Sequence, residues 1–208
     1  MEYFSYILTL KTGHINNYIK MTHKPLLYFK NHTEWRNWLH ENHDNHSVVE
    51  LIFYRVDSEM ESMRWEEAVK VAICYGWIDS TVRKLDDERR KQTFTPRKDK
   101  SVWSKVNKNY IEELISNNLM HETGLKKIET AKQNGSWESL DAVENLEIPE
   151  DLQMEFDKNK IALENYTNFS KSYKKSFLYW LNQAKRPETR QNRINEIISL
   201  CEKNIKSR

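Results

Sequence analysis

Two short stretches carry most of the information about the fold: Gly76-Trp77-Ile78-Asp79-Ser80, and Phe94-Thr95-Pro96-Arg97 followed by Ser101-Val102-Trp103-Ser104-Lys105-Val106-Asn107. The first stretch follows an apolar helical segment at residues 63–75, for which Ser62 is the predicted N-cap and Gly76 the left-handed stop. The second precedes the apolar stripe of another helix, predicted to begin after an N-cap at Ser101 and to end near Asn117. Both stretches therefore lie at helix ends, where unpaired backbone groups are available for binding.

The residues between and before these stretches have strand patterns. Residues 77–85 and 91–96 indicate a β-hairpin, because the turn at 86–90 is too densely charged to be buried. Residues 26–29 predict a short strand, and the β-branched and aromatic run at 48–54 predicts a mostly buried one. With helices at 33–43 and 122–133, the expected fold class is α+β: a small antiparallel β-sheet packed with helices.

The second half of the chain reads as helical. Apolar residues recur at helical spacing through residues 169–184, and Pro187 is placed to begin a last helix. The polar stretch that ends at Pro149 looks like a linker between two halves. We therefore expect an N-terminal extension without function at 1–22, an α+β domain at 23–137, a linker at 138–149 and an all-helical unit at 150–208.

The sequence motifs at residues 76–80 and 94–107 resemble those of the bacteriocin-protection, YdeI/OmpD-associated family of bacteria. Two further motifs share this resemblance: Trp65-Glu66-Glu67-Ala68 and Ala184-Lys185-Arg186-Pro187-Glu188-Thr189-Arg190. The likeness extends from about residue 26 to residue 201 and keeps the order of motifs expected of that family. It implies a YdeI-like domain followed by an OmpD-associated-type helical domain. It also implies a stress-response role in protection against bacteriocins or cationic antimicrobial peptides. A shared fold does not by itself supply a mechanism.

The predicted site is an anion pocket at the junction of the two stretches. A helix N-terminus near Ser101, with the Arg97 guanidinium close by, would favour a phosphate or carboxylate. Asp79 could orient Arg97 or accept a hydrogen bond from a ligand hydroxyl. The alternative is that Asp79 and Arg97 pair only with each other and that both tryptophans belong to the core. The predicted ligand-binding residues are Trp77, Asp79, Arg97, Ser101, Trp103, Ser104 and Asn107.

The net charge of +2 conceals three blocks of charge. Residues 83–108 carry a net +6, residues 138–164 a net −7 and residues 171–208 a net +7. Mutual neutralisation of these blocks is favoured over binding of a polyanion. Arg186, Arg190 and Arg193 form a basic surface at helical spacing, which could contact nucleic acid, acidic lipid or the acidic block. A solvated or ion-paired face is the favoured reading of that stripe.

Several functional classes are excluded by composition. The mean hydropathy is −0.87 and no apolar run approaches the length of a membrane span, so a cytoplasmic protein is expected. Two widely separated cysteines argue against a disulfide framework. The glycines allow neither a P-loop nor a dinucleotide fingerprint. The spacing of His40, His43 and His46 is poor for zinc. No cofactor, no metal and no catalytic residue are assigned.

The sequence therefore favours a protein that acts by binding. The expected partner is a small anion or another protein, and a homo-oligomer is compatible with the charge blocks. Two alternatives remain open. One is an enzyme acting on a small phosphorylated or carboxylated substrate, with Asp79 as general base. The other is a nucleic-acid-binding protein that uses the two basic blocks, which is the less favoured partner.

Overall fold

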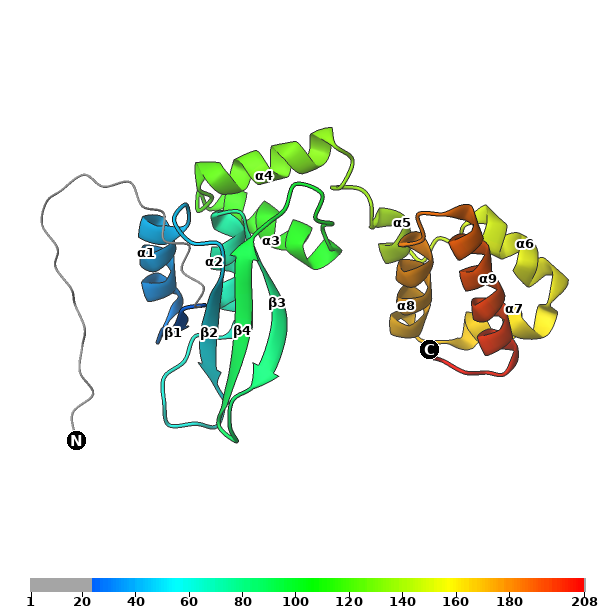
Figure 1. Ribbon diagram of the computed structural model, residues 1–208, viewed down its shortest axis with the longest axis horizontal. Helices are drawn as coiled ribbons and strands as arrows, with labels where there is room; N and C mark the ends of the chain where they lie inside the picture. Colours follow the sequence, from blue (N-terminus) through cyan, green and yellow to red (C-terminus); the bar gives the residue numbers. More distant parts are fainter. Residues whose placement is uncertain (1–23, 208) are drawn as a thin grey trace, which may run out of the picture.

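The computed structural model describes residues 24–207, and the predicted extension at residues 1–22 lies outside them (Figure 1). Strands and helices within the described range follow the order β1 (Leu26–Tyr28), α1 (His32–Asn42), β2 (Val49–Tyr54), α2 (Trp65–Cys74), β3 (Trp77–Lys84), β4 (Arg89–Pro96), α3 (Lys105–Ser116), α4 (Glu122–Gln133), α5 (Asp141–Glu144), α6 (Glu150–Lys158), α7 (Lys160–Asn168), α8 (Lys171–Asn182) and α9 (Pro187–Glu202). This arrangement confirms the predicted fold class: a small sheet with helices, then an all-helical unit.

The sheet has the strand order β1-β2-β4-β3 and is mixed. β2, β4 and β3 pair antiparallel, whereas β1 pairs parallel to β2 because α1 carries the chain back between them. Side chains of β2 alternate between buried and half-buried, so one face of the sheet is covered. α1 and α2 pack on that face, and the indole nitrogen of Trp35 donates to the Ala68 carbonyl at 3.2 Å.

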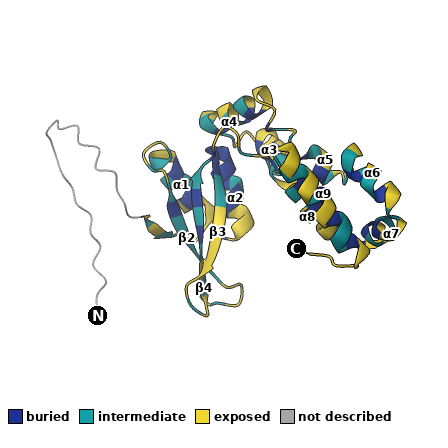
Figure 2. Cartoon of the chain, turned by 45° about the vertical axis from the view of Figure 1, so that its right-hand side comes forward, coloured by how far each residue is buried: buried dark blue, intermediate teal, exposed yellow. Residues whose placement is uncertain are grey.

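The two sequence stretches that predicted the fold lie side by side at one end of β3 and β4. Trp77 pairs with Pro96 in the ladder, and the Arg97 amide donates to the Gly76 carbonyl at 2.8 Å. Gly76 has φ +71°, the left-handed conformation predicted for the end of α2. Trp77 is buried in the first hydrophobic core, edge-on to Trp38 at 6.5 Å. The other end of the hairpin extends beyond the helices, and the second half of β3 is exposed (Figure 2).

Two predicted helix caps are wrong. α3 begins at Lys105, and its N-cap is Ser104, which accepts from the Asn107 amide at 3.3 Å, whereas Ser101 precedes the helix in the loop. Ser62 does not cap α2 either, because its hydroxyl accepts from the Tyr54 amide at 3.1 Å at the end of β2. At α3 a serine three residues further along is the cap, whereas α2 has Arg64 at its N-cap position and the Arg64 amide donates to the Glu67 carboxylate at 2.7 Å.

The helices α6 to α9 form the second hydrophobic core, which includes Phe156, Phe177 and Ile197. The predicted linker holds α5, and both Leu140 and Val143 are buried in this core. Lys108 of α3 forms an ion pair with Asp141 at 2.5 Å, so the two units touch beside α5. No helix within residues 24–207 is both long and apolar enough to span a membrane.

Candidate anion-binding site

The predicted site is centred on Arg97, which follows β4. Its side chain is 2% exposed, and its Nη1 donates to the Val102 carbonyl at 2.9 Å. The guanidinium carbon lies 3.6 Å from the centre of the Trp103 ring, a cation–π contact. The other two nitrogens, Nε and Nη2, are buried and have no hydrogen-bond partner among the described residues. Two donors of a buried cation are therefore left unsatisfied.

The electrostatic setting of Arg97 follows from this burial. Removal from water disfavours the charged form and lowers the pKa of Arg97 to about 10, while the carboxylate of Asp79 acts in the opposite direction. At neutral pH the guanidinium stays protonated. An acceptor with two oxygens, such as a carboxylate or phosphate, has the geometry to satisfy two guanidinium nitrogens together.

Asp79 is engaged by neighbours other than Arg97. Its Oδ2 accepts from the indole nitrogen of Trp65 at 3.1 Å and from the amide nitrogen of Gln92 at 2.5 Å. Within residues 24–207 no ion pair joins Asp79 to Arg97. Gln92 is buried and its Oε1 has no partner in the same range. Asp79 therefore positions the first residue of α2 rather than the arginine.

The remaining predicted residues divide between the loop and the core. Trp103 is 1% exposed and lies 5.3 Å from Trp137, so it forms one face of the Arg97 site from within the core. Trp77 is also 1% exposed and contacts Trp38, on the core side. The Ser101 amide donates to Lys98 within the loop, and Ser104 and Asn107 are occupied in capping α3. The structure thus brings Arg97 and Trp103 together, whereas Trp77 packs in the core, Asp79 holds Trp65, Ser101 lies in the loop, and Ser104 and Asn107 form the cap of α3.

The N-terminus of α3 is covered by a carboxylate of the chain itself. Glu144 of α5 accepts from the Lys105 amide at 3.5 Å and pairs with Lys175 of α8 at 2.5 Å. A negative charge at that helix end is what the dipole favours. The sequence patterns did not single out Glu144, although it belongs to the acidic block between the two basic ones. This contact leaves Arg97, not the helix N-terminus, as the unsatisfied element.

The arginines of the predicted basic surface are mostly engaged inside the C-terminal unit. Arg190 forms a two-point contact with Asp151 of α6, which lowers the pKa of that carboxyl group. Arg193 donates to the Trp180 carbonyl and lies 5.0 Å from its ring. Arg186, the N-cap of α9, is exposed and forms no ion pair with a described residue.

Of the three histidines whose spacing is poor for zinc, His40 and His43 lie near His121, the N-cap of α4, whereas His46 lies against the Trp38 ring. His121 lies 5.0 Å from His43 and 5.9 Å from His40, and it stacks on Tyr75 at 4.9 Å, all between ring centres. Burial, and then the neighbouring histidines, lower the pKa of His121. Among the described residues no group of three or more histidine, cysteine or acidic side chains is arranged to hold a metal ion.

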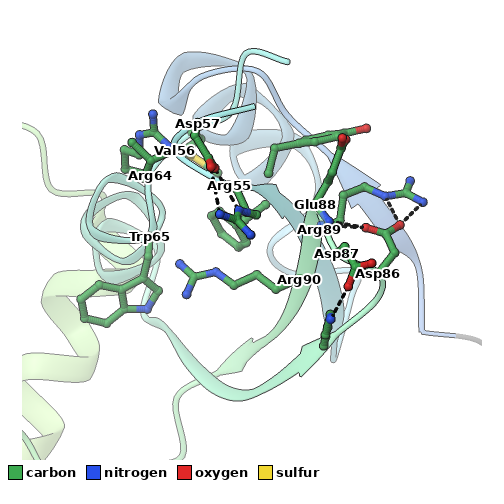
Figure 3. Close-up of a pocket in the computed structure, with 14 residues that line it drawn as sticks. Arg55, Val56, Asp57, Arg64, Trp65, Asp86, Asp87, Glu88, Arg89 and Arg90 are labelled. Carbon is green, nitrogen blue, oxygen red and sulfur yellow. Dashed lines mark hydrogen bonds and ion pairs between the residues drawn. The ribbon is translucent and has the colours of Figure 1, made fainter. Parts of the chain in front are cut away.

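Sequence patterns also missed a cavity of about 620 Å³ between the start of α2 and the hairpin (Figure 3). Trp65, Arg64 and Arg90 line it. In the sequence Trp65 stands out only as part of a motif shared with the family, and the two arginines lie far apart in the chain. The signal that could have found them is the pairing of a basic hairpin with an aromatic residue at a helix start.

Two family models match the chain. Residues 27–127 match a domain of unknown function, DUF8412. Residues 145–204 match the family described as bacteriocin-protection, YdeI or OmpD-associated. No curated protein and no solved structure matches. The family that the sequence motifs resemble is thus matched by the helical unit alone, and the N-terminal domain matches a separate family model. The C-terminal helical region is therefore similar, over residues 145–204, to the family described as bacteriocin-protection, YdeI or OmpD-associated.

Proposed function

We propose that this protein contributes to protection against bacteriocins or cationic antimicrobial peptides as a stress protein, and that it acts by binding rather than by catalysis. The family of residues 145–204 supports the protective role. The two buried free thiols, Cys74 and Cys201, suit the reducing cytoplasm in which we place the protein. The binding element that we propose is the junction of the two sequence stretches at Arg97, where it recognises an anionic group.

The unsatisfied guanidinium of Arg97 carries this proposal. Leaving a charged donor buried without an acceptor destabilises a protein, so such a group usually has a functional reason or an unseen partner. A small oxyanion would supply acceptors for Nε and Nη2 while Nη1 keeps its bond to Val102. Trp103 would hold the guanidinium plane in place through its ring face.

Fewer unpaired cations are available for binding nucleic acid than the sequence suggests. Lys108, Lys175 and Arg190, from the two basic blocks, each form an ion pair with a residue of the acidic block. This pairing supports the reading in which the blocks neutralise each other. Binding to nucleic acid would therefore have to use the remaining cations and would fall steeply with added salt.

The test is a thermal-shift screen of the full chain against inorganic phosphate, phosphorylated metabolites, organic acids and single-stranded DNA. Each ligand is tested at about 50 mM and about 500 mM salt, because a buried ion pair is screened less than a surface one. Arg97→Met removes the guanidinium and keeps most of the volume, and Arg83→Gln is the control because Arg83 is exposed and forms no ion pair with a described residue.

We expect a salt-resistant rise in melting temperature with at least one small anion, retained in Arg83→Gln and lost in Arg97→Met. A ligand-induced rise of equal size in wild type and Arg97→Met would refute the Arg97 site. A rise seen only with DNA, and only at low salt, would move the function to the basic blocks.

A further inference from the structure

A cavity of about 620 Å³ opens on the side of the sheet where the hairpin projects, and its size falls in the range of small-molecule sites. Its walls come from three places: residues 53–57 at the end of β2, residues 63–65 at the start of α2, and Lys84 with residues 86–90 of the hairpin. Arg97 is not among the lining residues. The cavity is therefore separate from the site proposed above.

The charges that line this cavity do not cancel. Three of its cations have partners of their own: Arg55 with Asp57 at 2.8 Å, Lys84 with Asp87 at 2.5 Å, and Arg89 with Asp86 at 2.6 Å. These internal pairs remove equal numbers of positive and negative charges from the balance.

Two arginines of the lining are left over. Neither Arg64 nor Arg90 forms an ion pair with any residue that the structure describes, and Glu88 is the corresponding unpaired acid. Figure 3 shows Arg90 extending from the hairpin toward Trp65, while Glu88 lies beside Arg89. Next to Trp65 the lining therefore presents the Arg90 guanidinium without an acid partner from the lining, and the Asp79 carboxylate bonded to the indole is not a lining residue.

Trp65 gives this part of the cavity a fixed aromatic wall. Its side chain is 38% exposed, yet its indole nitrogen is held by Asp79 at 3.1 Å, and Gln92 holds Asp79 in turn. A hydrogen-bonded indole has fewer rotamers to lose when a ligand binds. Phe53 and Met63, both buried, add apolar surface, and the Arg90 guanidinium lies 5.7 Å from the Phe53 ring.

We propose that this cavity binds a small aromatic anion, a flat ring that carries a carboxylate or phosphate group. The ring lies against Trp65, and the anionic group is bound by Arg90, whose side chain extends toward that ring (Figure 3). Each part of the ligand matches one feature of the cavity: the ring matches the exposed indole of Trp65, and the anionic group matches the Arg90 guanidinium, which forms no ion pair with a described residue. Asp79 acts here as a positioning residue, because it touches Trp65 and not the ligand.

The test is isothermal titration calorimetry of the full chain with phenyl phosphate and with benzoate. Inorganic phosphate and benzyl alcohol are the comparison ligands, since each carries only one of the two features. Arg90→Gln removes a cation of the cavity, and Trp65→Leu removes the flat wall. The matched control is Arg83→Gln, an exposed and unpaired arginine on the adjacent strand that does not line the cavity.

We expect phenyl phosphate or benzoate to bind at least about tenfold more tightly than either comparison ligand. Arg90→Gln and Trp65→Leu should each weaken that binding by about tenfold or more, and Arg83→Gln should leave it unchanged. Arg97→Met should also leave it unchanged, which separates this site from the Arg97 site.

Three results would overturn the proposal. The first is no binding of either aromatic anion at millimolar concentration. The second is an equal loss in Arg90→Gln and Arg83→Gln, which would mean that general positive charge attracts the ligand. The third is equal affinity for phenyl phosphate and inorganic phosphate, which would remove the aromatic part. Circular dichroism of each variant checks that the substitution leaves the fold intact.

Discussion

Replacing Arg97 by methionine should change the stability of the unliganded protein little, although the side chain is 2% exposed. The substitution removes the charged hydrogen bond to Val102, worth about 1.5–3 kcal/mol. It also removes the cation–π contact with Trp103, worth up to about 2 kcal/mol. Against this, it relieves two unsatisfied buried donors, at about 1–3 kcal/mol each. Because gains and losses are of similar size, the free energy of unfolding should stay within about 2 kcal/mol of wild type.

The assay is urea denaturation followed by far-ultraviolet circular dichroism, with the slope of the transition checked for each variant. Arg97→Lys is the matched control: it keeps a buried charge but loses the planar donor group, so it should be less stable than Arg97→Met. A loss above about 3 kcal/mol in Arg97→Met would refute the reasoning. That is the loss expected when a fully satisfied buried charge network is broken.

Further predictions concern packing and pH. Gly124→Ala should destabilise the fold by about 2–4 kcal/mol in urea, despite alanine's helix propensity, because its Cβ would lie 2.2 Å from the Cys74 carbonyl oxygen. The pKa of His121 is lowered from 6.5, so the unfolded chain takes up the proton first. Stability should therefore fall as pH drops below about 6.5, and less so in His121→Asn, measured by thermal melts. Asp151→Asn should cost about 1 kcal/mol or less, since its contact with Arg190 is partly exposed.

Local patterns were sufficient for much of the fold. The bounds of α4 agree with the sequence prediction, because its apolar spacing is regular and Gly135, with φ +78°, ends the segment. The hairpin was predictable because its turn is densely charged. The short helix α5 was not, since four residues are too few for a periodic signal, and it was assigned to a linker.

The features of the caps and of the site that the sequence did not predict depend on contacts between residues that are distant in the chain. Ser101 and Ser104 are both suitable caps, and only the observed path of the loop shows that Ser104 is used. Glu144 covers the end of α3 from the other unit. The burial of Arg97 depends on Trp103 and on the loop between them, a contact that the sequence did not indicate. Contacts between residues that are distant in the chain produce no regular spacing in the sequence by which they could be predicted.

The central claim, that Arg97 binds an anion, is tested most directly by its own side-chain resonance. In a ¹H–¹⁵N spectrum of arginine Nε–Hε groups, the Arg97 signal is the one absent from Arg97→Met. Titration with the most stabilising anion of the screen should shift this signal strongly, because Nε has no partner in the described structure. An Arg97 signal that stays in place while the anion saturates the protein would contradict the account.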